Sequence, residues 1–283
     1  MPLTALGGTA GTVVIGDTTT TLFPQLLHPK VAEFISVLSA NSAPLTGAQV
    51  NALNNLYIGL VANGLDTKMV ALYPFIGGTA NAHKFNLMDA RDADAAFRLS
   101  FLGGGWTHNA NGSTPNGTSS YADTFINIST LGNWETNNHL SVYSPTTSGN
   151  FSWNIAAGSD ATTGTNIFGL GLRTTPVYDN GNGFTNRASG GSGGGFWIGA
   201  TTGNNLRRIY KNGQTIASNT TTNSQAAPNL SLYIGRGNTP GYTSVFMPNN
   251  FRFITVGRTL TDREVSTLNS LTQNYQVALN RQV

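Results

Sequence analysis

The chain has no cysteine and little charge. Without cysteine, disulfides, thiolate catalysis and sulfur-ligated metals are all excluded. Charged residues make up 10% of the 283 residues, well below the roughly 25% of an average globular domain. The surface must therefore be solvated by neutral Asn, Thr, Ser and Gly. This composition indicates a surface exposed outside a cell or on a particle, where amides and hydroxyls can meet sugars or neighbouring subunits.

Clustered basic charge and long hydrophobic runs are also missing. The 15 basic residues exceed the 12 acidic ones only slightly, and no basic run is longer than Arg207-Arg208. A phosphate-binding surface needs a clustered basic patch, so we expect no nucleic-acid partner. The first residues lack both a positive start and a continuous apolar core. We therefore expect neither a signal peptide nor membrane insertion.

The acidic residues do not suggest an enzyme. A glycosidase needs two carboxylates facing each other about 5–10 Å apart. Five of the 12 acids have local explanations, either in a loop around Arg91 or at the start of the last helix: Asp89, Asp92, Asp94, Asp262 and Glu264. Others stand singly: Asp123, Glu135, Asp160 and Asp179. We expect no catalytic residues and no cofactor.

Neither a serine motif nor the histidines indicate a catalytic or metal site. Residues 190–194 fit the Gly-X-Ser-X-Gly pattern, but a glycine run leading into a strand lacks the strand-turn-helix context of a nucleophile elbow. The histidines show no paired helical spacing for zinc: His28, His83, His108 and His139. We expect His83 to be a hydrogen-bonded structural residue and no metal site to be present. A calcium ion held by Asp89, Asp92 or Asp179 with backbone carbonyls remains an alternative.

Three helices are predicted from caps and periodicity. Pro29 occupies the favoured first position of a short helix. Thr46 and Gln49 form a capping box for a second helix that stops at Gly64, and Thr261 with Glu264 does the same for the last helix. The stretch 69–101, whose apolar first part closes on Pro74, is expected to end the helical region and to start a sheet.

The rest of the chain is predicted to be short strands separated by turns. The Asn212-Gly213 pair favours a type I′ hairpin. Regularly spaced short strands are typical of a sandwich or jelly roll. The expected strands cover residues 95–101, 121–126, 139–143, 151–156, 167–172, 195–200, 207–211, 214–217, 230–235 and 251–256.

One long motif resembles a known family. It comprises Tyr73-Pro74-Phe75, Gly77-Gly78-Thr79-Ala80, His83-Lys84-Phe85-Asn86-Leu87 and Asp94-Ala95-Ala96-Phe97-Arg98. With the ending Leu279-Asn280-Arg281-Gln282-Val283, it resembles virion structural proteins of tailed phages and prophages of Bacteroidetes. The likeness extends from about residue 29 to residue 283.

The resemblance implies a fold. Phe196-Trp197-Ile198-Gly199, the hairpin at 209–213, and the segments 230–236 and 251–260 look like the second half of a laminin-G or lectin-like domain. We therefore expect an antiparallel β-sandwich, a concanavalin-A/laminin-G-like jelly roll with N-terminal helices and a C-terminal helix. The expected organisation is an extended arm at 1–28, a helical region at 29–70 and the lectin-like sandwich at 71–283.

The resemblance also implies a setting, which is the virion surface. We expect a non-enzymatic fibre, spike or decoration protein, made in the host cytoplasm and displayed on the extracellular particle, that adheres to host-surface polysaccharide. The alternative is a purely structural capsid or tail assembly protein, and a third reading is a polysaccharide depolymerase. The expected partners are a homo-oligomer, taken as a trimer, and other virion proteins contacted through the N-terminal region.

Sugar recognition combines aromatic faces with amides and hydroxyls. The turn-rich stretches 103–121, 131–139 and 178–187 carry such mixtures. Each aromatic residue in them could instead belong to the core or to an interface, whereas Trp153 and Trp197 are assigned to the core. The glycan-binding candidates are Trp106, Tyr121, Trp134, Tyr178 and Tyr242.

Overall fold

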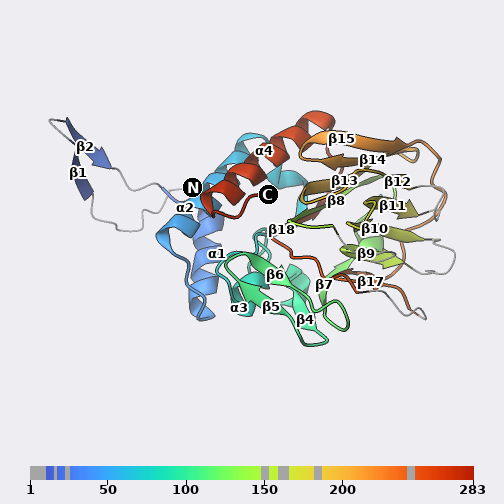
Figure 1. The fold of residues 1–283 in the computed structure, drawn as a ribbon, viewed down its shortest axis with the longest axis horizontal. Coiled ribbons are helices and arrows are strands. Elements are labelled where there is room, and N and C mark those ends of the chain that lie inside the picture. Colours follow the sequence, from blue (N-terminus) through green and yellow to red (C-terminus); the bar gives the residue numbers. More distant parts are fainter. Residues whose placement is uncertain are drawn as a thin grey trace.

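Two antiparallel sheets pack face to face, and helices cover the outside of one of them (Figure 1). The structure is a computed structural model that describes residues 11–15, 18–22, 26–147, 153–158, 166–181, 187–240 and 246–283. This architecture confirms the expected fold class, a mainly β antiparallel sandwich with a few helices.

The sheet that lies under the helices has six strands. Their order is β15 (Gln214–Asn219), β14 (Leu206–Lys211), β13 (Gly195–Thr202), β8 (Asn137–Ser144), β18 (Phe253–Gly257) and β3 (Met69–Tyr73). All neighbours in this sheet are antiparallel. The predicted hairpin joins β14 to β15, with positive φ values of 49° at Asn212 and 80° at Gly213.

The second sheet has eight strands and forms the other layer of the sandwich. Its order is β12 (Ala188–Ser189), β11 (Val177–Gly181), β10 (Ile167–Gly171), β9 (Ile155–Gly158), β16 (Ser231–Ile234), β7 (Tyr121–Asn127) and β4 (Ser100–Leu102). The short strand β17 (Gly237–Asn238) pairs in parallel with β9. A separate hairpin is formed by β5 (Thr107–Asn109) and β6 (Gly112–Thr114).

Strand alternation builds two cores, one on each face of the six-stranded sheet. On β13, Phe196 and Ile198 point toward the helices, whereas Trp197 points into the space between the sheets. Trp197 is fully buried and Trp153 nearly so, as expected. The sandwich is therefore closed by side chains from both sheets, and the helices add a third layer.

The three long helices begin where their caps predicted. They are α1 (Pro29–Ala40), α2 (Gly47–Ala62) and α4 (Asp262–Ala278); a single turn, α3 (Ala80–His83), lies between β3 and β4. Both capping boxes are formed, at Thr46 and at Thr261. Helices α2 and α4 approach closely at Gly59, where an added Cβ would lie 2.3 Å from Cδ2 of Leu271.

Two predicted elements are wrong. Residues 69 and 70, placed in the helical region, belong to β3 at the edge of the six-stranded sheet. Only the end of 95–101 is a strand, because Asp94–Ala96 form a 3₁₀ turn and Phe97 has a φ of 60°. A five-residue apolar run is too short for periodicity to separate strand from helix. Strands β5, β6, β11, β12 and β17, and the strand Thr18–Leu22 near the N-terminus, were not predicted.

The C-terminal segment is held by Arg281, which is buried. Its guanidinium donates to the carbonyl oxygens of Pro74, Phe75 and Arg252 at 2.7–2.9 Å, and to that of Ala110 at 3.3 Å. Its Nε donates to Oε1 of Gln276 at 2.7 Å. One side chain thus joins the chain end to three separate loops of the sandwich.

In the expected N-terminal arm, β1 (Gly11–Ile15) pairs with β2 (Thr18–Leu22). Residues 1–10, 16–17 and 23–25 lie outside the described residues, and the role of the arm stays a prediction. No helix in the described part of the chain is long and apolar enough to cross a membrane.

Candidate functional site

A cluster of aromatic side chains lies on the outer face of the eight-stranded sheet. On β7, burial alternates, so that Ala122 and Ile126 enter the core between the sheets and Tyr121 and Asp123 face outward. Tyr233 lies opposite Asp123 in the register with β16. The rings of Tyr121 and Tyr233 meet at a centroid distance of 5.0 Å. Two half-buried tyrosines therefore sit side by side on this face.

Arg236 and Phe246 complete this cluster. The ring of Phe246 lies 6.5 Å from that of Tyr121. The central carbon of the Arg236 guanidinium lies 4.8 Å, 5.7 Å and 5.4 Å from the centroids of Tyr121, Tyr233 and Phe246. We call these four half-buried residues the Tyr121 patch. It offers aromatic faces and a cationic donor on one surface.

Asp123 and Leu102 border the Tyr121 patch. Leu102 pairs with Tyr121 across β4 and β7 and is exposed. The carboxylate of Asp123 accepts a hydrogen bond from the backbone N–H of Phe125 at 2.8 Å. Burial raises the pKa of Tyr233, and the charges of Asp123 and Tyr121 raise it further. Tyr233 therefore remains a neutral hydroxyl that can donate a hydrogen bond at physiological pH.

Trp106, a sequence candidate, contacts the backbone of Tyr121. Its ring is half-buried against Phe101 and Phe251, with centroid distances of 5.0 Å and 6.3 Å. Its indole Nε1 donates to the carbonyl oxygen of Tyr121 at 3.2 Å. The structure thus brings two predicted residues, Trp106 and Tyr121, together at one edge of the sheet.

Two other candidates lie in the core, which removes them as ligand contacts. Trp134 is 1% exposed and Tyr178 is 0% exposed. The hydroxyl of Tyr178 bonds to Asn138 and to Oγ1 of Thr201, the latter at 2.8 Å. The Tyr178 ring fills the space above Gly199 of the facing sheet. A jelly roll needs large rings between its sheets, and sequence alone could not separate these from surface rings.

Tyr242 lies outside the described residues. Sequence reasoning did not find Tyr233, Arg236 and Phe246. The first two lie in the segment 230–236, where alternation between apolar Leu232 and Ile234 could have placed Tyr233 outward. The register of β16 against β7, which brings it to Tyr121, has no local sequence signal.

The acids and the histidine singled out in the sequence have structural partners. Asp89 pairs with Arg91, Asp92 with Lys84 and Arg98, and Asp94 with Arg98, as expected for that loop. Asp179 is fully buried and pairs with Arg187. Nδ1 of His83 lies 3.0 Å from Nδ1 of His108, and burial lowers the pKa of His83 to about 3. The described residues contain no group of three or more His, Asp or Glu that could hold a metal ion.

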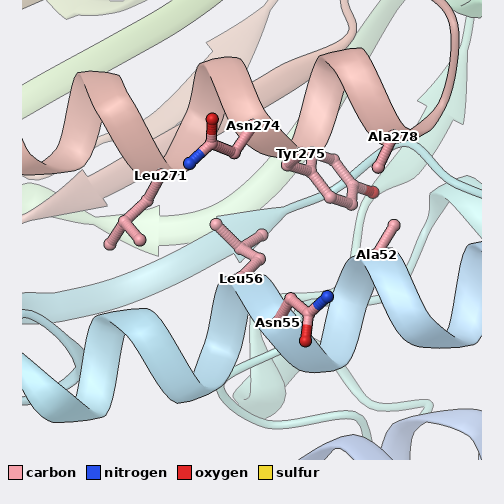
Figure 2. Close-up of a pocket in the computed structure, with 7 residues that line it drawn as sticks. All are labelled: Ala52, Asn55, Leu56, Leu271, Asn274, Tyr275 and Ala278. Atoms are coloured by element: carbon pink, nitrogen blue, oxygen red, sulfur yellow. The ribbon is translucent and has the colours of Figure 1, made fainter.

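A second surface feature is a shallow groove between α2 and α4, shown in Figure 2. Its volume is about 190 Å³. Exposed apolar side chains lie on the same two helices: Ile58 and Val61 on α2 are 41% and 40% exposed, and Val277 on α4 is 54% exposed. The groove is lined by Ala52, Asn55, Leu56, Leu271, Asn274, Tyr275 and Ala278.

No protein-family profile matches the sequence, and no curated protein matches it. Solved structures do match. A mutant of Trypanosoma rangeli sialidase displaying trans-sialidase activity aligns with a TM-score of 0.53 and 13% identity, over 87% of this chain and 38% of that chain. This chain therefore spans well under half of that protein.

Two other structures align with lower scores. The binding domain of botulinum neurotoxin serotype D has a TM-score of 0.47 and 10% identity, over 72% of this chain and 52% of that one. Domain 4 of the extracellular arabinanase AbnA from Geobacillus stearothermophilus, in complex with arabinotriose, has a TM-score of 0.43 and 15% identity, over 71% of this chain and 98% of that one. At these identities the likeness concerns the fold, which is a lectin-like antiparallel β-sandwich.

Proposed function

We propose that the chain is a non-enzymatic glycan-binding protein of a phage virion surface, and that the Tyr121 patch makes the glycan contact. The observation that carries the glycan proposal is the position of Tyr121, Tyr233 and Phe246 around Arg236 on the outer face of the sandwich. The phage setting rests on the resemblance of the 73–98 motif to virion proteins.

The chemistry of the patch suits a sugar. The faces of pyranose rings are lined by C–H groups that pack on aromatic rings, while their hydroxyls need donors and acceptors. The patch supplies half-buried tyrosine rings with hydroxyls, a guanidinium, and the Asp123 carboxylate at its border. Each such contact is weak, and display of many copies on one particle multiplies the strength of attachment.

The carboxylates support a binding role over hydrolysis. Among the described residues, Asp123 is the acid placed at the border of the Tyr121 patch, whereas most glycoside hydrolases use a pair of carboxylates. Asp262 is bound by Arg208 and Tyr210, and Glu264 by Lys68. These acids serve the capping and docking of α4. A depolymerase is therefore the least favoured of the three sequence hypotheses.

The test is binding of the full-length protein, displayed on beads, to intact host cells before and after enzymatic stripping of the surface polysaccharide. We expect saturable binding that stripping abolishes and that Tyr121→Ala or Tyr233→Ala weakens about tenfold, since one lost contact of about 1.4 kcal/mol changes affinity by that factor. Tyr178→Phe, a core change, serves as the matched control. Binding that is unaffected by stripping and by both surface substitutions would contradict the proposal.

A structural assembly role is the second candidate. The exposed apolar residues Ile58, Val61 and Val277 on the paired helices α2 and α4 favour it, because each is an apolar side chain that another protomer could cover. We propose a homotrimer with this contact between subunits. Light scattering of the full-length protein and of an Ile58→Ser, Val61→Ser variant checks this. A trimer that both proteins form equally well would rule out these residues as its contact.

A further inference from the structure

Arg236 differs in its contacts from other arginines of this protein. The central carbon of its guanidinium lies within 5.7 Å of the centroids of three aromatic rings. Its Nε donates to the carbonyl oxygen of Gly237 at 3.2 Å. Among the described residues, neither terminal nitrogen has a hydrogen-bond acceptor and no carboxylate forms an ion pair with Arg236. By contrast, Arg91, Arg187 and Arg208 each pair with an aspartate.

The terminal nitrogens of this guanidinium have no acceptor among the described residues, so its donor edge is available to a ligand. The cation–π contact uses the face of the planar group, while its N–H donors point outward in the plane. Because Nε is already engaged, the remaining donors are the pair on Nη1 and Nη2. Two parallel N–H groups at this spacing complement the two oxygens of a carboxylate. The rings that fix the guanidinium also reduce the conformational freedom lost when a ligand binds.

Asp123 sets a limit on what can bind beside Arg236. It faces the same side of the sheet, accepts the Phe125 N–H and does not pair with Arg236. A second anion placed against Asp123 would be repelled, whereas a hydroxyl could donate to it. The complementary ligand therefore carries its negative charge at one end and hydroxyls at the other.

We infer that the Tyr121 patch recognises an acidic sugar, a uronic or sialic acid, through its carboxylate. Arg236 holds the carboxylate with Nη1 and Nη2, Tyr121 and Tyr233 pack against the sugar ring, and Asp123 accepts from a hydroxyl. This inference rests on the proposed glycan-binding function and adds the chemical class of the ligand.

The experiment is an NMR titration of the full-length ¹⁵N-labelled protein with single sugars. The acidic probes are galacturonate, glucuronate and N-acetylneuraminate; the neutral probes are galactose, glucose and N-acetylglucosamine, and galactose 6-sulfate supplies a non-planar anion. The readout is the Nε–Hε signal of Arg236, assigned by its loss in Arg236→Gln. Arg263→Gln, which removes an exposed arginine of α4, controls for general charge effects.

We expect at least one acidic sugar to shift the Arg236 signal saturably and to bind about tenfold more tightly than its neutral counterpart, the factor that a charge-assisted bidentate contact supports. Arg236→Gln should lower the affinity for that acid to the level of the neutral sugar, with Arg263→Gln unchanged. Methyl esterification of galacturonate, if that is the acid bound, should have the same effect as Arg236→Gln.

Three results overturn the inference, and they separate it from the proposed function. Equal binding of acidic and neutral sugars, weakened by Tyr121→Ala but not by Arg236→Gln, would support glycan binding by the patch. It would refute recognition of the sugar carboxylate by Arg236. A shift of the Arg236 signal with galactose 6-sulfate alone would show that the site recognises a different anion. The absence of any sugar response, together with normal cell binding by Tyr121→Ala, would remove both proposals.

Discussion

Replacement of Arg281 by alanine should be among the most destabilising single changes in this protein. The Arg281 side chain is buried and donates to four backbone carbonyls and to Gln276. Burial lowers its pKa, and no carboxylate of the described residues forms an ion pair with it. The carbonyl dipoles of three loops therefore compensate for the buried charge, and the guanidinium is the donor that those loops share.

The magnitude follows from the acceptors that lose their donor. The carbonyl of Pro74 keeps a bond from the Tyr275 hydroxyl at 3.1 Å, whereas those of Phe75, Ala110 and Arg252 lose the Arg281 donor. An unsatisfied buried acceptor costs about 1–3 kcal/mol. Because water can enter part of the vacated space, we expect a loss of about 4 kcal/mol in the free energy of unfolding. For a chain of this size that lowers Tm by about 8–15 °C.

Thermal and urea denaturation followed by circular dichroism would measure this loss. Arg263→Ala, at an exposed position at the start of α4, is the matched control and should stay within about 0.5 kcal/mol of the parent. Arg281→Lys keeps the charge but not the planar fork, so it should recover only part of the stability. A fall in Tm of less than about 2 °C for Arg281→Ala would refute the argument that this side chain holds the three loops.

Three other predictions concern pH and the core. Burial lowers the pKa of His83 to about 3 and that of His139 to about 4. The unfolded chain therefore takes up protons below pH 6.5 that the folded one excludes, and stability should fall as pH drops through that range. At pH 5 each histidine lowers the free energy of unfolding by about 2 kcal/mol. An equal urea midpoint at pH 7.5 and pH 5 would contradict this. Gly199→Ala should cost about 2–3 kcal/mol, since its Cβ would lie 2.1 Å from Cδ2 of Tyr178; denaturation with an unchanged midpoint would show that the ring can move aside. Tyr178→Phe should lower the free energy of unfolding by about 1–2 kcal/mol in the same assay without altering glycan binding. Weakened glycan binding would show that Tyr178 belongs to the binding site.

Local chemistry in the sequence predicted local structure well. The capping boxes at Thr46 and Thr261 and the Asn212-Gly213 hairpin form as expected, because each depends on groups within four residues of one another. The boundary of the helical region at residue 70 and the strand through Phe97 were predicted wrongly, because the conformations there depend on distant partners. Residues 69–73 become a strand by pairing with β18, about 180 residues later in the chain.

The sequence by itself therefore determined the helix starts, the tight hairpin, the neutral polar surface and the mainly β class, since each arises from composition or from short-range contacts. Tertiary structure alone decided which aromatic rings reach the surface. Tyr178 and Trp134 occupy the space between the sheets, whereas Tyr121 meets Tyr233 and Arg236 through the register of β7 against β16. One position of slip in that register would turn the same rings into the core, and no local signal in the chain specifies it.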